Sequence, residues 1–229
     1  MNLTRTLRRH LINIVAMYYG DFAEIERLYS RFDRGLSKIK VVVDVDEGID
    51  CSRERFLDLY RSMAGIFPTI SKHSCCEGWE SAPLYVTSEK GVSVKRIGEL
   101  ADFPHLLEHL IVDVQCNVGK MSSCSGITCG WKKPESRFDL FVECGDPRIG
   151  VFAACFAANL MNNFMAGHPV EDDCHVLLEV AGMVETYPET KDEIAKLATA
   201  LGESVENISS AINQLANFHF FNDGVGNEQ

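Results

Sequence analysis

The stretch FPHLLEHLIVDVQCNV, residues 103–118, determines how the rest of the chain can be interpreted. Its apolar residues recur at helical spacing and predict an amphipathic helix packed on a core. These residues are Leu106, Leu107, Leu110, Ile111, Val114 and Val118. His105, Glu108 and His109 form an H-x-x-E-H pattern on the opposite arc. At about 100° per residue, the two histidines lie about 40° apart and Glu108 lies about 60° to the other side of His105.

The H-x-x-E-H pattern is a candidate metal site. Two histidines at i and i+4 can both reach one ion, and a neighbouring Glu can take a proton from a water molecule that the ion activates. The same spacing is the inverted zincin pattern of a group of zinc peptidases, although it also occurs on solvated helix faces. Val112 and Cys116 continue the histidine-bearing face, so we expect it to look into a cleft. Asp113 lies one turn on from His109 and is expected to orient a ligand imidazole as a hydrogen-bond acceptor.

Length, charge and cysteine content restrict the function classes. The chain has 229 residues, which fits one large domain or one domain with an appended helical segment. The net charge of −11 argues against a nucleic-acid or anionic-membrane surface. Nine cysteines without a C-x-x-C pair, together with no secretory pattern, predict a reducing, cytoplasmic location. No apolar run is long enough to span a bilayer, so no membrane association is expected.

Changes in residue pattern divide the chain into three predicted parts. Residues 1–38 are predicted to be a helical extension, because their apolar residues fall on one stripe. Residues 39–167 combine strand-like and helical patterns and are predicted to form an α+β domain. Residues 168–229 show only helical patterns. The predicted fold class is therefore α+β, with a small mixed sheet packed by helices and followed by an all-helical C-terminal segment.

The individual elements follow from periodicity and turn residues. The predicted strands are residues 39–46, a hairpin within 84–96, and residues 137–144. The predicted helices are residues 2–32, 53–66, the H-x-x-E-H helix, about 147–166, 171–185, 189–201 and 205–221. Residues 117–136 are rich in Gly and Ser and are predicted to be a loop. The last helix contains no Lys or Arg, so the final helical pair is expected to pack on the core or on a second subunit of a homo-oligomer, with no role in binding DNA.

Several motifs, in order, resemble the N-terminal domain of cyanophycin synthetase. They are FPTISKHSCCEG (67–78), HLLEHLIVDVQ (105–115), a Gly-rich loop, the strand RFDLFVEC (137–144) and the Ala-rich helix GVFAACFAANLM (150–161). The similarity covers roughly residues 39–168. Full enzymes of that family add an ATP-grasp domain and a Mur-ligase-like domain, neither of which fits in 229 residues. The resemblance therefore concerns the N-terminal domain alone.

This resemblance implies a role in holding an arginine–aspartate polymer and, as in some members, in cutting it as a metallopeptidase. His105, Glu108 and His109 match the family's His-x-x-Glu-His, and His73 matches the histidine of its preceding loop. After the helix the family carries Gly-Arg-Thr-Arg, whereas this chain has Gly-Ile-Thr-Cys at residues 126–129. Both arginines are absent, which argues against recognition of an identical polymer.

A hydrolytic zinc ion needs three protein ligands and an open position. His105 and His109 are the first two expected ligands, and His73 is the preferred third because a loop imidazole can fold over the helix. The inverted zincins instead take a Glu from a later helix, so Glu179 and Glu185 are the alternatives by that analogy. Zinc is the expected cofactor under either ligand set.

Two functions remain open from the sequence, which does not decide whether the protein is an enzyme. In the first, Glu108 is the general base of a zinc-dependent amide or peptide hydrolase that acts on a peptide or a cyanophycin-like polymer. In the second, the same fold binds a peptide, a polymer or a partner protein without metal, and the H-x-x-E-H face makes only hydrogen bonds. The sequence favours the hydrolase slightly.

Overall fold

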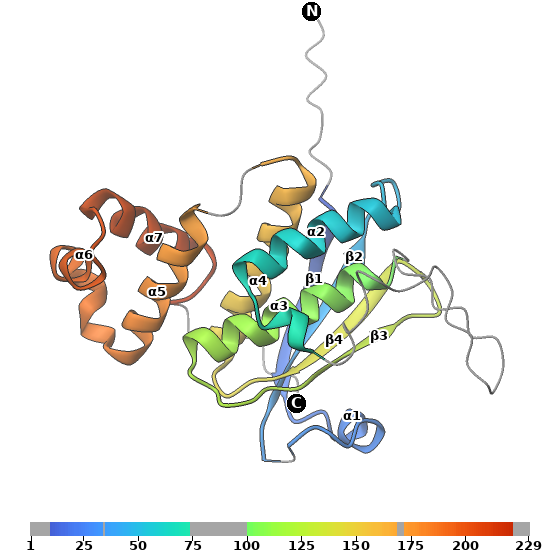
Figure 1. The fold of residues 1–229 in the computed structure, drawn as a ribbon. Coiled ribbons are helices and arrows are strands. Elements are labelled where there is room, and N and C mark those ends of the chain that lie inside the picture. The colour runs from blue at the N-terminus through green and yellow to red at the C-terminus, as the bar shows by residue number, and fades with distance from the viewer. Residues whose placement is uncertain (1–9, 34, 74–99, 169–171, 222–229) are drawn as a thin grey trace, which may run out of the picture.

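The computed structural model describes residues 10–33, 35–73, 100–168 and 172–221. Residues 84–96, predicted as a hairpin, lie outside this description. A four-stranded sheet carries helices on one face, and three further helices gather at one end of the molecule (Figure 1). The predicted α+β class with a helical C-terminal region is therefore confirmed.

The sheet has the strand order β1-β2-β4-β3, and every neighbouring pair is antiparallel. The strands are β1 (Ile12–Gly20), β2 (Lys38–Val45), β3 (Gly126–Gly130) and β4 (Arg137–Glu143). β2 and β4 confirm the strands predicted at 39–46 and 137–144. They lie in the middle of the sheet, where Val41, Val43 and Leu140 are fully buried.

β1 lies where the sequence predicts a helix, so the helical prediction is wrong for residues 12–20. The strand directs four residues toward the core residues opposite them on β2: Ile12, Ile14, Met17 and Tyr19. A register shift between Ile14 and Ala16 interrupts the alternation, which places these residues two, three and two positions apart. Leu11, Ile14, Val15 and Tyr18 of the same segment fall at positions i, i+3, i+4 and i+7, which is the spacing of a helix face and explains the error.

β3 corrects a second prediction, because residues 117–136 are predicted to be a loop. Residues 126–130 instead pair with β4, and Thr128 lies opposite the buried Leu140. The Gly and Ser residues of this stretch carry little intrinsic strand preference. Pairing with β4 therefore determines the strand, and this pairing is a long-range contact that a local pattern does not encode.

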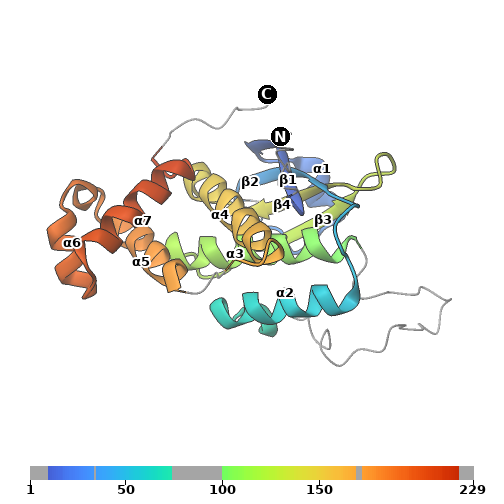
Figure 2. The ribbon, with the colours of Figure 1, turned by 90° about the horizontal axis from the view of Figure 1, so that it is seen from above.

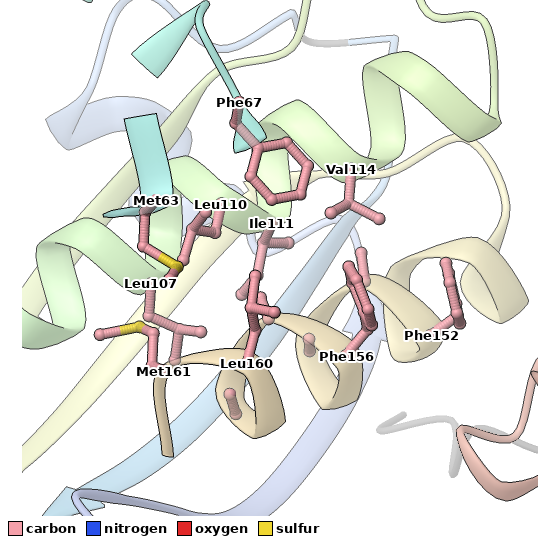
Figure 3. Close-up of a cluster of buried hydrophobic side chains, with 14 of the residues drawn as sticks. Met63, Phe67, Leu107, Leu110, Ile111, Val114, Phe152, Phe156, Leu160 and Met161 are labelled. Atoms are coloured by element: carbon pink, nitrogen blue, oxygen red, sulfur yellow. The ribbon is translucent and has the colours of Figure 1, made fainter. Parts of the chain in front are cut away.

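Two helices cover one face of the sheet, and a third packs on their outer side (Figure 2). They are α3 (Asp102–Val118), α4 (Pro147–Met165) and α2 (Arg53–Ile66), which confirm the three helices predicted there. Figure 3 shows side chains of all three helices in contact, including Met63 of α2, Ile111 of α3 and Phe156 of α4. Fourteen of the 17 residues of α3 are buried, so its histidine-bearing face is not a solvated surface.

The C-terminal helices are α5 (Asp172–Thr186), α6 (Ile194–Leu201) and α7 (Val205–Asn217). α5 and α7 confirm the predicted helices, whereas the helix predicted at 189–201 is divided. Residues 188–192 form a 3-10 turn, and α6 begins only at Ile194. After α7, the rings of Phe218 and Phe220 pack on Phe152 of α4, which attaches this region to the core as expected. No helix among the described residues has both the length and the apolar character needed to cross a membrane.

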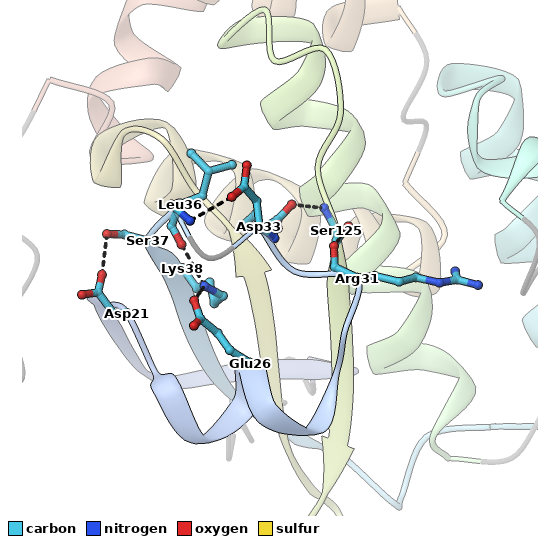
Figure 4. Close-up of polar contacts among 10 residues, drawn as sticks. Asp21, Glu26, Arg31, Asp33, Leu36, Ser37, Lys38 and Ser125 are labelled. Atoms are coloured by element: carbon cyan, nitrogen blue, oxygen red, sulfur yellow. Dashed lines mark hydrogen bonds and ion pairs between the residues drawn. The ribbon is translucent and has the colours of Figure 1, made fainter.

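A short helix, α1 (Ala23–Leu28), covers part of the opposite face of the sheet. An apolar cluster between them contains Ile25, Phe32 and Phe141. Lys38, the first residue of β2, has a fully buried side chain beside this cluster. Its ammonium group lies 2.6 Å from Glu26 Oε1 and donates to the carbonyl oxygen of Leu36 at 2.8 Å (Figure 4). These contacts fix α1 and the loop that follows it against the sheet.

Replacing Glu26 by Ala is expected to lower the free energy of unfolding by about 3 kcal/mol, because a buried ammonium group would lose its counter-charge. The double variant Glu26→Ala with Lys38→Met is expected to be more stable than Glu26→Ala alone, because it removes both charges. Glu24→Ala is the matched control, since Glu24 is an exposed residue of the same helix. Urea denaturation measures all three, and equal losses for Glu24→Ala and Glu26→Ala would contradict the buried pair.

Candidate functional site

A cavity of about 500 Å³ lies between α3, β3 and the segment that follows α1. The residues that line it include His73, His105, Glu108, His109, Thr128 and Arg31. All four residues expected at the centre of a metal site from the sequence therefore lie around one cavity, although His73 comes from a different part of the chain than α3. The expectation that the histidine-bearing face looks into a cleft is confirmed.

Glu108 is buried and is held against β3. Its Oε2 atom accepts a hydrogen bond from the hydroxyl of Thr128 at 2.7 Å. Gly126 lies beneath the same carboxylate, and a Cβ atom at this position would be 2.5 Å from Glu108 Oε1. The Glu108 side chain therefore fits only because residue 126 is a glycine and has no side chain of its own. The sequence analysis noted both residues only as part of the Gly-Ile-Thr-Cys stretch and assigned neither a role beside Glu108; the alternation of Gly126, Thr128 and Gly130 was the available signal.

His105 and His109 face each other one helical turn apart. Their Nε2 atoms are 3.1 Å apart and their ring centroids 4.6 Å apart. His109 is buried, whereas His105 is partly exposed. Two nitrogens bound to one tetrahedral zinc at about 2.0–2.1 Å lie about 3.4 Å from each other, so this pair has nearly the spacing of two zinc ligands. The same distance also fits one hydrogen bond between two neutral imidazoles.

His73 follows the 3-10 turn Ile70–Lys72 and lies beside the α3 histidines. Its ring centroid is 4.4 Å from that of His109, and the two rings meet edge to face. The buried Asp113 accepts a hydrogen bond from the hydroxyl of Thr69 at 2.6 Å, and its Oδ1 atom is 3.4 Å from His73 Nε2. The sequence suggested that Asp113 orients His109, but its hydrogen-bond partners in the structure are Thr69 and His73.

Most of the residues that line this cavity lie in a range that matches a known protein family. A family model described as the cyanophycin synthase-like N-terminal domain matches residues 40–166. The chain belongs to this family. The matched range contains most of β2 and all of α2, α3, β3, β4 and α4, so the resemblance inferred from the motifs is confirmed. A search of curated proteins gave no match.

Two residues of the cavity wall lie outside the range that matches the cyanophycin synthase-like domain. Tyr29 and Arg31 line the cavity but lie outside the matched range, in the segment between α1 and β2. They belong to the part of this chain that precedes the matched range, and they form one wall of the cavity. No motif in the sequence pointed to either residue, because only the tertiary structure brings them beside α3.

Glu179 and Glu185, the alternative third ligands expected from the sequence, lie outside the cavity. Glu179 is exposed on α5, and Glu185 Oε2 lies 3.5 Å from Arg148 Nη2. Burial raises the pKa of Glu185, and the nearby Arg148 opposes that rise. Neither Glu lines the cavity. Among the residues that the structure describes, no three His, Cys, Asp or Glu side chains are arranged to hold a metal ion, so the zinc site remains a prediction.

Proposed function

We propose that this chain is a zinc-dependent amide or peptide hydrolase that acts on a peptide or a cyanophycin-like polymer. The observation that carries the proposal is the meeting of Glu108 with two imidazole nitrogens, 3.1 Å apart, at the wall of one cavity. A cavity of about 500 Å³ is large enough to receive several residues of an extended substrate. Most of its wall belongs to the family domain.

His105 and His109 would hold the ion through their Nε2 atoms, and His73 is the preferred third ligand. Asp113 would then orient the His73 imidazole as a hydrogen-bond acceptor, a common arrangement around zinc. When bound, zinc supplies an electrophile that polarises the substrate carbonyl and makes water more acidic. All three imidazoles are suitable ligands only in their neutral form, so occupancy is expected to fall in acid.

Glu108 acts as the general base in this proposal. Its carboxylate takes a proton from the attacking water and returns it to the amine nitrogen as the carbon–nitrogen bond breaks. The hydrogen bond from Thr128 to Oε2 fixes the orientation of the carboxylate within the cavity. Glu108 is also buried, and its carboxylate packs directly against Gly126 of β3.

The same contact supports one alternative, a metal-free module that binds a peptide, a polymer or a partner protein. At 3.1 Å the two Nε2 atoms can share one hydrogen bond, which satisfies both of these nitrogens without an ion. His73 and Asp113 likewise form a contact that requires no metal. The polar residues of the cavity would then serve only to bind the peptide groups of the ligand.

Metal content separates these two functions. Protein purified without chelators or a histidine tag is expected to contain about one equivalent of zinc, and His105→Ala is expected to retain less than about one tenth of it. His175→Ala is the matched control, because His175 is exposed on α5 and lies outside the cavity. Elemental analysis measures all three proteins. Metal-free wild-type protein whose unfolding is unchanged by added zinc or by chelation would exclude the hydrolase and leave the binding module.

A further inference from the structure

Arg31 is the only arginine or lysine among the described residues that line the cavity. Its side chain is exposed and extends away from the polar contacts around α1 (Figure 4). Within the described part of the chain, its guanidinium group has no ion pair and no hydrogen bond. The group is therefore free to bind a substrate that enters beside it.

The backbone around Arg31 is held in place by a buried carboxylate. Glu143 Oε1 accepts a hydrogen bond from the amide of Asp33, and its Oε2 accepts one from the amide of Ser125 at 2.8 Å. The hydroxyl of Ser125 donates to the carbonyl oxygen of Arg31 at 3.4 Å. Ser125 directly precedes Gly126, which lies under Glu108. These contacts fix the Arg31 segment to the same strand that supports the proposed general base.

Acidic and basic side chains line different sides of the cavity. Asp102 and Glu108 bring two carboxyl groups along α3, whereas Arg31 brings a guanidinium from the opposite segment. An anionic group of a substrate is repelled by the α3 carboxylates and attracted by Arg31. A guanidinium also matches the two oxygens of a carboxylate in a bidentate geometry. The cavity therefore has a preferred orientation for a peptide that carries one carboxylate.

We propose that Arg31 is a specificity-determining residue that binds a carboxylate of the peptide substrate. This inference rests on the proposed function, because it identifies the substrate class of the same cavity. The carboxylate is either the C-terminal carboxylate of the peptide or the side chain of an acidic residue. Arg31 lies outside the range matched by the family model, so the family match assigns no role to it.

Two pairs of probe peptides test the proposal and distinguish the two carboxylates. One pair is N-acetyl-Ala-Ala with a free C-terminus and with a C-terminal amide. The other is N-acetyl-Asp-Ala-amide and N-acetyl-Asn-Ala-amide. Dissociation constants are measured by NMR titration in the Glu108→Gln variant, so that the result does not depend on hydrolysis. In at least one pair the carboxylate member is expected to bind about 10-fold more tightly, and Arg31→Gln is expected to reduce this ratio to about 1.

Arg27→Gln is the matched control, because Arg27 is exposed on α1 and does not line the cavity. It is expected to keep the carboxylate preference. Equal affinities within both pairs, or a preference that survives Arg31→Gln, would overturn the proposal. Because the titration requires neither turnover nor bound zinc, failure of the hydrolase function would be seen separately, as a lack of metal or of product.

Discussion

Replacing Glu108 by Gln is expected to lower kcat for a peptide that the wild-type protein cleaves by about 10²–10⁴-fold, while the zinc content stays at the wild-type level. Glutamine has nearly the same size as glutamate, and its amide oxygen can still accept the hydrogen bond from Thr128. It cannot take a proton from water. The variant therefore removes the chemical step and leaves the packing between α3 and β3 in place. Steady-state kinetics together with elemental analysis measure both quantities.

Glu179→Gln is the control for this experiment, because it makes the same chemical change at an exposed position of α5 outside the cavity. It is expected to keep both turnover and zinc. If Glu108→Gln lost zinc as well as turnover, Glu108 would be a metal ligand, and a different group would have to act as the base. If Glu108→Gln retained full turnover, the general-base role would be wrong.

The features that the sequence predicted correctly are those encoded by local periodicity. The apolar residues of α3 recur every three or four positions over 17 residues, which fixes both the helix and the side from which His105, Glu108 and His109 project. β2 and β4 are short runs of β-branched and aromatic residues in the middle of the sheet. The family resemblance came from the order of these same motifs, and the match over residues 40–166 confirms it.

The features that the sequence did not predict depend on contacts between distant segments. β1 was hidden because the register shift after Ile14 replaces strict alternation with an irregular spacing. β3 was hidden because it is short and lies in a stretch rich in Gly and Ser, so only its pairing with β4 defines it as a strand. Arg31 and Thr69 reach the site only through loops whose positions are fixed by Glu143 and Asp113. Such contacts cannot be inferred from the spacing of residues within one segment.

Replacing Gly126 by Ala is expected to lower the free energy of unfolding by about 1–3 kcal/mol. The added Cβ atom would lie 2.5 Å from Glu108 Oε1 and 2.9 Å from the Cγ and Cδ atoms of the same side chain. α3 is buried along most of its length, so the helix cannot retreat, and either the Glu108 side chain or β3 must move. Displacing the carboxylate by about 1 Å is also expected to lower kcat by about 100-fold. Urea denaturation and steady-state kinetics measure the two losses.

Gly130→Ala is the matched control, since Gly130 lies on the same face of the same strand and its added Cβ atom would meet only the ring of Phe138, at 3.4 Å. That separation is close to ordinary van der Waals contact, so the loss of stability is expected to be smaller than for Gly126→Ala. A double-mutant cycle identifies the cause: if the clash with Glu108 is responsible, Gly126→Ala is expected to cost at least 1 kcal/mol less, roughly, in a Glu108→Ala background. An equal cost in both backgrounds would mean that the glycine is required by the backbone of β3 and not by the proposed general base.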